Sequence, residues 1–246
     1  MPKSFFIDTS RCTACRGCQI ACKEWYELPA NKTKQTGTHQ NPPDLNENNL
    51  KLVRFSEHLE DGKIKWYFFP DQCRHCIDPP CVHAGGYLVE GAIIHDEKTG
   101  AVIYTDKTKL LSEEDFEDIR ASCPYDIPRR NPETGQIFKC TMCYDRVSRG
   151  MLPMCVKACP TGAMNFGNRK EMLDLANSRL KQVSKEFPQA FLADSDSVNV
   201  IYLLVDDPMK YHQFSVAGLR KDMDRKQFLA KLSSPIVRPA RAAVDL

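Results

Sequence analysis

The sequence has no long apolar run and no visible export signal. Its 246 residues contain no apolar stretch of the length that a transmembrane helix requires. The longest, VIYLLV at 200–205, has the length of a buried strand. The N-terminal residues MPKSFFIDTS lack the apolar region and cleavage site of a signal peptide. We therefore expect a chain without a membrane anchor, which stays inside the cell or leaves it with a partner that carries the signal.

The sequence also lacks a strong net charge and the common catalytic motifs. Its formal net charge of +2 gives no bulk attraction to nucleic acid. No G-x-G-x-x-G run, P-loop, Ser-His-Asp pattern or pair of carboxylates marks a substrate site. These absences give no support to a nucleotide-binding or hydrolytic enzyme. They indicate a protein that acts as a conductor, while the chemical reaction takes place in another protein.

Cysteine is the residue that the sequence has in excess. The chain contains twelve: Cys12, Cys15, Cys18, Cys22, Cys73, Cys76, Cys81, Cys123, Cys140, Cys143, Cys155 and Cys159. Disulfides suit the even number, but they are typical of short secreted chains. Zinc sites use paired C-x-x-C motifs, of which this chain has several. Iron–sulfur clusters are favoured over both, because the spacing of the first four cysteines is that of bacterial ferredoxins.

The first cysteine run, RCTACRGCQIACKEW at 11–25, has the form C-x2-C-x2-C-x3-C. In two-cluster ferredoxins the fourth cysteine of such a run binds the other cluster. The run CTMCYDRVSRGMLPMCVKACP at 140–160 has the same form, with its middle interval lengthened to eleven residues. The exchange rule then predicts two sets of ligands. The first set is Cys12, Cys15, Cys18 and Cys159, and the second set is Cys22, Cys140, Cys143 and Cys155.

The four remaining cysteines predict a third cluster. CRHCIDPPC supplies three ligands of a loop, and SCPYDIP supplies one cysteine that is followed by proline. By the same exchange, the third set is Cys73, Cys76, Cys81 and Cys123. His75 and His83 lie among these cysteines, and we expect them to have structural roles or to contact the metal ligands without binding the metal. The total prediction is three [4Fe–4S] clusters with all twelve cysteines as metal ligands.

A fourth cluster site is absent as a unit. The position where the second motif would have its fourth cysteine is Gly85. Counted back from Cys123, the ligands of a third motif would stand at Glu113, Phe116 and Ile119. All four ligands of a fourth cluster are therefore missing together, whereas scattered loss of cysteines would leave incomplete sets.

The arrangement of the motifs predicts an α+β fold with two nested bacterial-ferredoxin-like modules, hairpin insertions and a C-terminal helical extension. Residues 1–50 with 124–170 would form an outer module that holds two clusters. Residues 51–123 would form an inner module with one cluster, and 171–246 an extension that contacts a partner. The irregular stretch 26–50 is expected to be a long loop that contacts another subunit.

Local patterns add four secondary structure predictions. The segments 51–70 and 91–106 read as hairpins, 112–122 as a helix with a Ser112–Asp115 capping pair, and 198–205 as a buried strand. After 160, apolar residues at helical spacing predict a packed helix. These are Leu173, Ala176, Leu180, Val183 and Phe187.

Several runs resemble the iron–sulfur beta subunits that accompany molybdopterin oxidoreductases. They are CTACRGCQIACKEW, FFPDQCRHCIDPPC, SCPYDIPRR and CPTGAMNFG. The twelve-cysteine pattern is most similar to the small subunit of the two-subunit tungsten or molybdenum formate dehydrogenases of sulfate-reducing bacteria. The likeness extends to about residue 214.

The resemblance implies a non-catalytic electron-transfer subunit. Its partner would be a large catalytic subunit that carries bis-molybdopterin guanine dinucleotide with tungsten or molybdenum and that converts formate. The acceptor would be a soluble multihaem cytochrome c, and the heterodimer would be periplasmic, exported by the signal of the large subunit. The alternatives are the electron-transfer subunit of a polysulfide or dimethyl sulfoxide type oxidoreductase, or a structural zinc-binding module.

Overall fold

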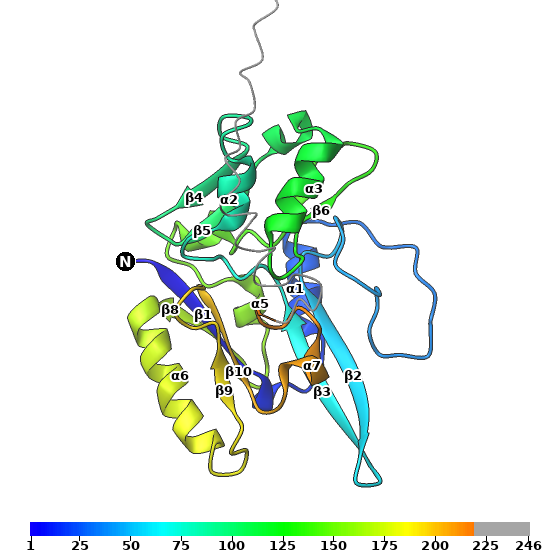
Figure 1. Cartoon of the computed structure of the whole chain (residues 1–246), viewed down its shortest axis with the longest axis vertical. Coiled ribbons are helices and arrows are strands. Elements are labelled where there is room, and N and C mark those ends of the chain that lie inside the picture. The colour runs from blue at the N-terminus through cyan, green and yellow to red at the C-terminus, as the bar shows by residue number, and fades with distance from the viewer. Residues whose placement is uncertain (219–246) are drawn as a thin grey trace, which may run out of the picture.

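The computed structural model of the chain describes residues 1–218, and Figure 1 shows their arrangement. Helices and strands are mixed along the chain, which confirms the α+β character that the sequence predicts. The final part of the predicted partner-contacting extension, 219–246, lies outside the described residues.

One four-stranded sheet joins the two ends of the described chain. Its order is β8–β1–β10–β9, and its strands are β1 (Lys3–Asp8), β8 (Met164–Asn168), β9 (Phe191–Ala193) and β10 (Val200–Leu204). Strand β1 pairs in parallel with β10 and antiparallel with β8. The buried strand predicted at 198–205 is confirmed, but the sequence analysis did not predict β1 or its pairing. The predicted helical extension therefore also contributes two strands to this sheet.

Helix α6 (Arg169–Val183) covers one face of the sheet (Figure 1). Because side chains alternate along a strand, Phe6 and Ile201 face this helix and pack with Ala176 and Val183. The predicted apolar stripe is confirmed over the helix. Phe187 lies beyond the helix end, although it packs in the same hydrophobic cluster.

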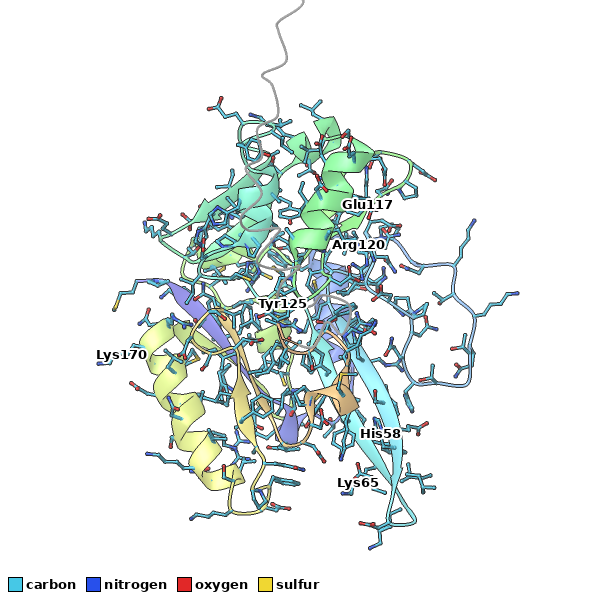
Figure 2. All side chains as sticks on the ribbon, in the orientation of Figure 1. His58, Lys65, Glu117, Arg120, Tyr125 and Lys170 are labelled. Carbon is cyan, nitrogen blue, oxygen red and sulfur yellow. The ribbon has the colours of Figure 1, made fainter. Side chains whose placement is uncertain are left out.

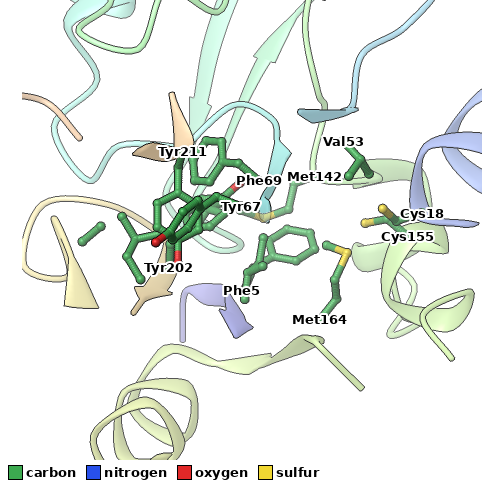
Figure 3. Close-up of a cluster of buried hydrophobic side chains, with 14 of the residues drawn as sticks. Phe5, Cys18, Val53, Tyr67, Phe69, Met142, Cys155, Met164, Tyr202 and Tyr211 are labelled. Atoms are coloured by element: carbon green, nitrogen blue, oxygen red, sulfur yellow. The ribbon is translucent and has the colours of Figure 1, made fainter. Parts of the chain in front are cut away.

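The opposite face of the sheet packs toward the cysteine-bearing loops. Figure 3 shows Phe5 and Met164 on this side, next to Cys18 and Cys155. Phe69 and Tyr202 stack nearby, with ring centroids 4.6 Å apart. The sheet thus has a helix on one side and the candidate metal-binding region on the other.

Both predicted hairpins form. Strands β2 (Leu52–Glu60) and β3 (Lys63–Asp71) pair antiparallel, as do β4 (Ile93–Asp96) and β5 (Ala101–Tyr104). Between β2 and the first cysteine run, residues 26–50 contain no helix or regular strand, as predicted. A short third pair consists of β6 (Arg129–Arg130) and β7 (Ile137–Phe138).

Short helices carry or flank the cysteines. They are α1 (Gly17–Trp25), α2 (Pro80–Gly85), α3 (Glu113–Ser122), α4 (Tyr144–Val147) and α5 (Met154–Lys157). A further short helix, α7 (Pro208–Tyr211), follows strand β10. Two 3-10 turns, Thr9–Arg11 and Asp106–Leu110, complete the described elements. The predicted capping pair is present on α3, since the Ser112 hydroxyl accepts from the Asp115 N–H and the Asp115 carboxylate accepts from the Ser112 N–H.

Candidate iron–sulfur cluster sites

Three C-x-x-C motifs of the chain adopt the same backbone turn. The residue directly before the second cysteine has a positive φ in each: 52° at Ala14, 46° at His75 and 62° at Met142. This left-handed conformation is uncommon for residues other than glycine and concentrates at functional sites. The repeated turn places one backbone N–H close to the sulfur of the first cysteine.

Those backbone N–H groups donate to cysteine sulfur. The His75 N–H lies 3.4 Å from the Cys73 Sγ, and the Met142 N–H lies 3.4 Å from the Cys140 Sγ. Burial raises the pKa of Cys12 to about 11, while a hydrogen bond from the Ala14 backbone acts in the opposite direction. N–H donors favour sulfur in its negatively charged form, which is the form that binds iron. Such donors are also among the groups that set the potential of a bound cluster.

The cysteines of the first set come from two distant parts of the chain, three from the first run and one, Cys159, from the last. Burial raises the pKa of Cys12 and Cys18, and the neighbouring Cys159 raises both further. Cys15 is exposed and is among the charges that act on Cys18. At Cys159 burial also raises the pKa, but the Met164 N–H and the Thr161 hydroxyl outweigh it, so the pKa is lowered.

The second set brings helix α1 together with helix α5. Cys22 is buried on α1, and burial is the main reason that its pKa is raised. The next three causes, in order, are the thiols of Cys140, Cys155 and Cys143. These are the three other members of the set that the exchange rule predicts, so residue 22 lies beside a loop more than a hundred residues further along the chain.

The third set lines a cavity between the β3–α2 loop and the end of α3. Its walls include all four of its cysteines, together with Tyr104 and Lys139. Burial raises the pKa of Cys123 to about 12, and Cys73 and Cys81 contribute to the rise. The structure therefore brings together the four cysteines that were assigned to one another by elimination.

The positions of the missing fourth site meet in a hydrophobic cluster. A Cβ atom at Gly85 would lie 2.4 Å from the Ile119 Cδ1, so helices α2 and α3 touch at these two positions. Phe116 and Ile119 are buried in the same cluster. Glu113 stands at the start of α3 and pairs with Arg130 over 3.4 Å. Apolar packing thus occupies the space between the residues that would have been ligands.

The two histidines among the cysteines differ in their surroundings. His75 is fully buried, and its Nδ1 accepts the Val102 N–H at 3.0 Å. Burial holds the pKa of His75 well below its usual value, so the ring is neutral. His83 is exposed and pairs with Asp78. The roles of both histidines stay predictions.

Sequence reasoning missed a set of buried charged residues around these sites. Arg54 and Arg74 both bind Asp71, at 2.7 and 2.8 Å, just before the second cysteine motif. Lys51 and Lys139 are also buried. A charged residue inside an apolar strand sequence, such as the arginine in LVRF, is the only signal that could have indicated them.

The sequence matches a family model and several characterised proteins. Residues 64–169 match the model of the 4Fe-4S dicluster domain. The chain is 58% identical over 216 residues to formate dehydrogenase 2 subunit beta (cytochrome c-553) of Nitratidesulfovibrio vulgaris, covering 87% of this chain and 99% of that protein. The chain belongs to the formate dehydrogenase iron–sulfur subunit family.

Two further relatives show the range of this family. The formate dehydrogenase subunit beta of Megalodesulfovibrio gigas is 53% identical over 217 residues, which are 88% of this chain and 100% of that protein. The nitrate-inducible iron–sulfur subunit of formate dehydrogenase from Escherichia coli is 38% identical over 222 residues, 88% of this chain and 71% of that subunit. In this family member, no helix within residues 1–218 is long and apolar enough to cross a membrane.

Proposed function

We propose that this chain is the electron-transfer subunit of a formate dehydrogenase and that it holds three [4Fe–4S] clusters. The observation that supports the proposal is that Cys22 lies near Cys140, Cys155 and Cys143, while the four cysteines of the third set line one cavity. Each set combines a C-x-x-C turn with a cysteine from a distant part of the chain, as ferredoxin-type ligation requires. A bound [4Fe–4S] cluster supplies transfer of one electron at a time.

The ligand assignment follows the three sets. The first cluster would be held by Cys12, Cys15, Cys18 and Cys159, the second by Cys22, Cys140, Cys143 and Cys155, and the third by Cys73, Cys76, Cys81 and Cys123. The N–H groups of Ala14, His75 and Met142 would stabilise the thiolates of the first cysteine in each loop. This is the role that donors near metal ligands usually have.

The number of clusters is supported by two independent observations. The dicluster match at 64–169 contains eight of the twelve cysteines, which is enough for two clusters. The remaining four lie before that match, at Cys12–Cys22, and supply ligands for one more. In addition, Gly85 packs against Ile119, so apolar contacts stand where a fourth set of ligands would be.

We also propose the nested arrangement of modules. Residues 1–50 with 124–170 form the outer module with two clusters, and 51–123 form the inner module with one. Two features support this division: the close approach of Cys22 to Cys140, and the cavity that Cys123 shares with the second motif. The segment 171–246 would then be the extension that contacts the partner.

The partner in this proposal is a large catalytic subunit with bis-molybdopterin guanine dinucleotide and tungsten or molybdenum. The acceptor is a cytochrome c, in keeping with the name of the Nitratidesulfovibrio relative, which specifies cytochrome c-553. The complex would be periplasmic and exported with the signal of the catalytic subunit. This chain would receive electrons from formate oxidation and pass them to the cytochrome.

The test is to purify the complex without oxygen and to determine iron, acid-labile sulfide and formate-dependent dye reduction. We expect about twelve irons and twelve sulfides in this chain, since each cubane contains four of each. Zinc without sulfide would overturn the proposal in favour of a structural zinc module. A partner subunit that reduces dimethyl sulfoxide or polysulfide but does not oxidise formate would mean that this chain transfers electrons in a different oxidoreductase.

A further inference from the structure

Two buried lysines near the cysteines have no carboxylate partner. Lys51 is 2% exposed, and its Nζ donates to the Pro70 carbonyl at 3.2 Å and to the Gln72 Oε1. Lys139 is 5% exposed, and its Nζ donates to the Cys140 carbonyl at 3.1 Å and to the Val102 carbonyl. Neither lysine forms an ion pair with any residue in the described part of the chain.

This lack of a counter-ion is unusual for a buried charge. Lysine is almost never fully buried unless it is paired, because the cost of removing an ammonium from water is high. Arg54 and Arg74 in the same region follow the rule, since both bind the carboxylate of Asp71. The carbonyl and amide oxygens around Lys51 and Lys139 are neutral. Both lysines therefore need negative charge from another source.

Lys51 lies where the first and second cysteine sets meet. Figure 3 shows Cys18 of the first set close to Cys155 of the second. Lys51 directly precedes strand β2 and is two residues from Val53, which packs in the same hydrophobic cluster as both of these cysteines. Burial raises the pKa of both thiols, and the charge of Lys51 opposes this rise. Lys51 thus acts on one cysteine of each set.

Lys139 lies where the second and third sets meet. It lines the cavity of the third set and directly precedes Cys140 of the second set. Its ammonium is 4.6 Å from the centroid of the Tyr104 ring, which lines the same cavity. At Cys81 burial raises the pKa and the charge of Lys139 is the strongest opposing influence. Lys139 therefore stands between these two sets as Lys51 stands between the first two.

We propose that Lys51 and Lys139 are positioning residues of the electron relay, each fixing a positive charge between two neighbouring clusters and raising the reduction potentials of both. The inference rests on the proposed function, because it takes the negatively charged clusters as the missing counter-ions. Lys51 acts on the first and second clusters, and Lys139 acts on the second and third. The second cluster is therefore influenced by both lysines.

The physical cause is charge balance. Each electron that enters the relay adds one negative charge beside a fixed ammonium, and the attraction between opposite charges is strong in a buried environment. The electron comes from formate oxidation in the catalytic subunit and leaves to the acceptor. The transfer adds an electron to a cluster and needs no further reactant. Without these charges the reduced form of each neighbouring cluster would be less stable, and the clusters would accept electrons less readily.

The experiment is a redox titration of the complete complex, followed by absorption and electron paramagnetic resonance, with Lys51→Met and Lys139→Met. The signals are first assigned with Cys→Ser variants of each set. We expect Lys51→Met to lower the potentials of the first and second clusters, and Lys139→Met those of the second and third. A tenfold fall in the ratio of reduced to oxidised cluster at fixed potential corresponds to about 59 mV for one electron.

Conservative variants separate charge from packing. Lys51→Arg and Lys139→Arg retain the charge and should restore most of the potential, whereas Lys51→Gln and Lys139→Gln should behave like the methionine variants. Lys170→Met, on the exposed side of α6 (Figure 2), is the control and should leave all three potentials unchanged. If the methionine variants fail to fold, the glutamine variants, which keep a donor, provide the test.

Different experimental results would overturn this inference and the proposed function. Three intact clusters whose potentials do not change in any lysine variant would overturn the role of the lysines and leave the relay in place. An equal shift of all three potentials in both variants would also overturn it, because the proposal requires a shift at adjacent clusters only. A complex without iron and sulfide would instead overturn the proposed function.

Discussion

At the scale of single residues, the cysteines work in sets that the local sequence does not make obvious. Cys22 is four residues from Cys18, yet the thiols that influence it most are Cys140, Cys155 and Cys143. Helix α1 explains the separation, because Cys18 stands in its first turn and Cys22 is one turn further along. Cysteines of one short run therefore have neighbours in different parts of the chain.

Exchange of Cys22 for serine tests this division. We expect Cys22→Ser to damage the second cluster, which loses one thiolate, and to leave the first cluster able to form. Iron and sulfide content and the spectrum of each cluster are the measurements. Cys15→Ser is the matched control, since it should affect the first cluster instead. A change in the first cluster of the Cys22→Ser variant would mean that Cys22 does not bind the second cluster.

The buried His212 predicts that the stability of the protein depends on pH. Burial lowers its pKa to about 4, with Arg54 contributing to the decrease, Asp71 opposing it and Arg74 adding to it. The ring is neutral, since its Nδ1 accepts the Phe214 N–H at 3.2 Å. An unfolded chain takes up this proton near pH 6.5, whereas the folded chain does so only near pH 4. The free energy of unfolding should therefore decrease as the pH falls from about 6.5 to 4.

Thermal unfolding at several pH values measures this effect. His212→Gln keeps an acceptor for the Phe214 N–H but does not titrate, so its melting temperature should decrease less over the same pH range. His83→Gln, at an exposed site, should follow the wild-type curve. Parallel curves for His212→Gln and the wild type would contradict the prediction.

At the scale of secondary structure elements, helix α3 takes the place of a ligand loop. Its capping box and three acidic residues in the first turn stabilise a helix where a ferredoxin would have a cysteine loop. Its buried face consists of Phe116 and Ile119, which pack against α2 and the β4–β5 hairpin. Apolar burial thus stabilises the contact of α3 with α2 and the β4–β5 hairpin.

Substitutions at this contact should change stability without changing iron content. Ile119→Ala leaves a cavity and should lower the free energy of unfolding by about 2–5 kcal/mol. Gly85→Ala places a methyl group against Ile119 and should cost about 1–3 kcal/mol by overpacking. Thermal unfolding and iron analysis are the measurements.

The double variant Gly85→Ala with Ile119→Ala provides the control for this contact. The added methyl group then enters the space that Ile119 leaves. The double variant should therefore be more stable than the sum of the two single effects indicates. Additive effects would mean that the two residues do not touch. A loss of iron in Ile119→Ala would contradict the structural role of this contact.

At the scale of the whole molecule, ionic contacts join the irregular segment 26–50 to the β2–β3 hairpin and to strand β6. Asp44 binds Arg54 on β2 at 2.7 Å and Arg129 on β6 at 2.6 Å. Arg129 also contacts Asp126, which binds Arg120 on α3. A loop without regular structure is therefore attached to the hairpin and to the chain that follows Cys123.

Asp44→Ala should release this attachment. We expect faster cleavage within 26–50 by a protease, a loss of about 1 kcal/mol or less in stability because Asp44 is partly exposed, and unchanged iron content. Limited proteolysis with mass analysis of the fragments measures the first effect. Glu47→Ala lies in the same segment but outside this ionic network and should cleave at the wild-type rate.

Local patterns in the sequence are enough to predict most helices and strands and to indicate that the cysteines bind metal. Both hairpins, the capped helix at 112–122 and the packed helix after 160 follow from periodicity and turn residues, because these features depend on neighbours within a few positions. The cysteine spacing likewise predicted iron–sulfur ligation, since three thiolates on one loop reach one cluster only at short intervals.

The tertiary structure decided what depends on contacts between distant segments. The parallel pairing of β1 with β10 joins residues nearly two hundred positions apart, and no local pattern specifies such a partner. The meeting of Gly85 with Ile119 and the burial of Lys51 and Lys139 between cysteine sets also appear only in three dimensions. A lysine in a sequence reads as a surface residue, and only folding shows that water has been removed from around its charge.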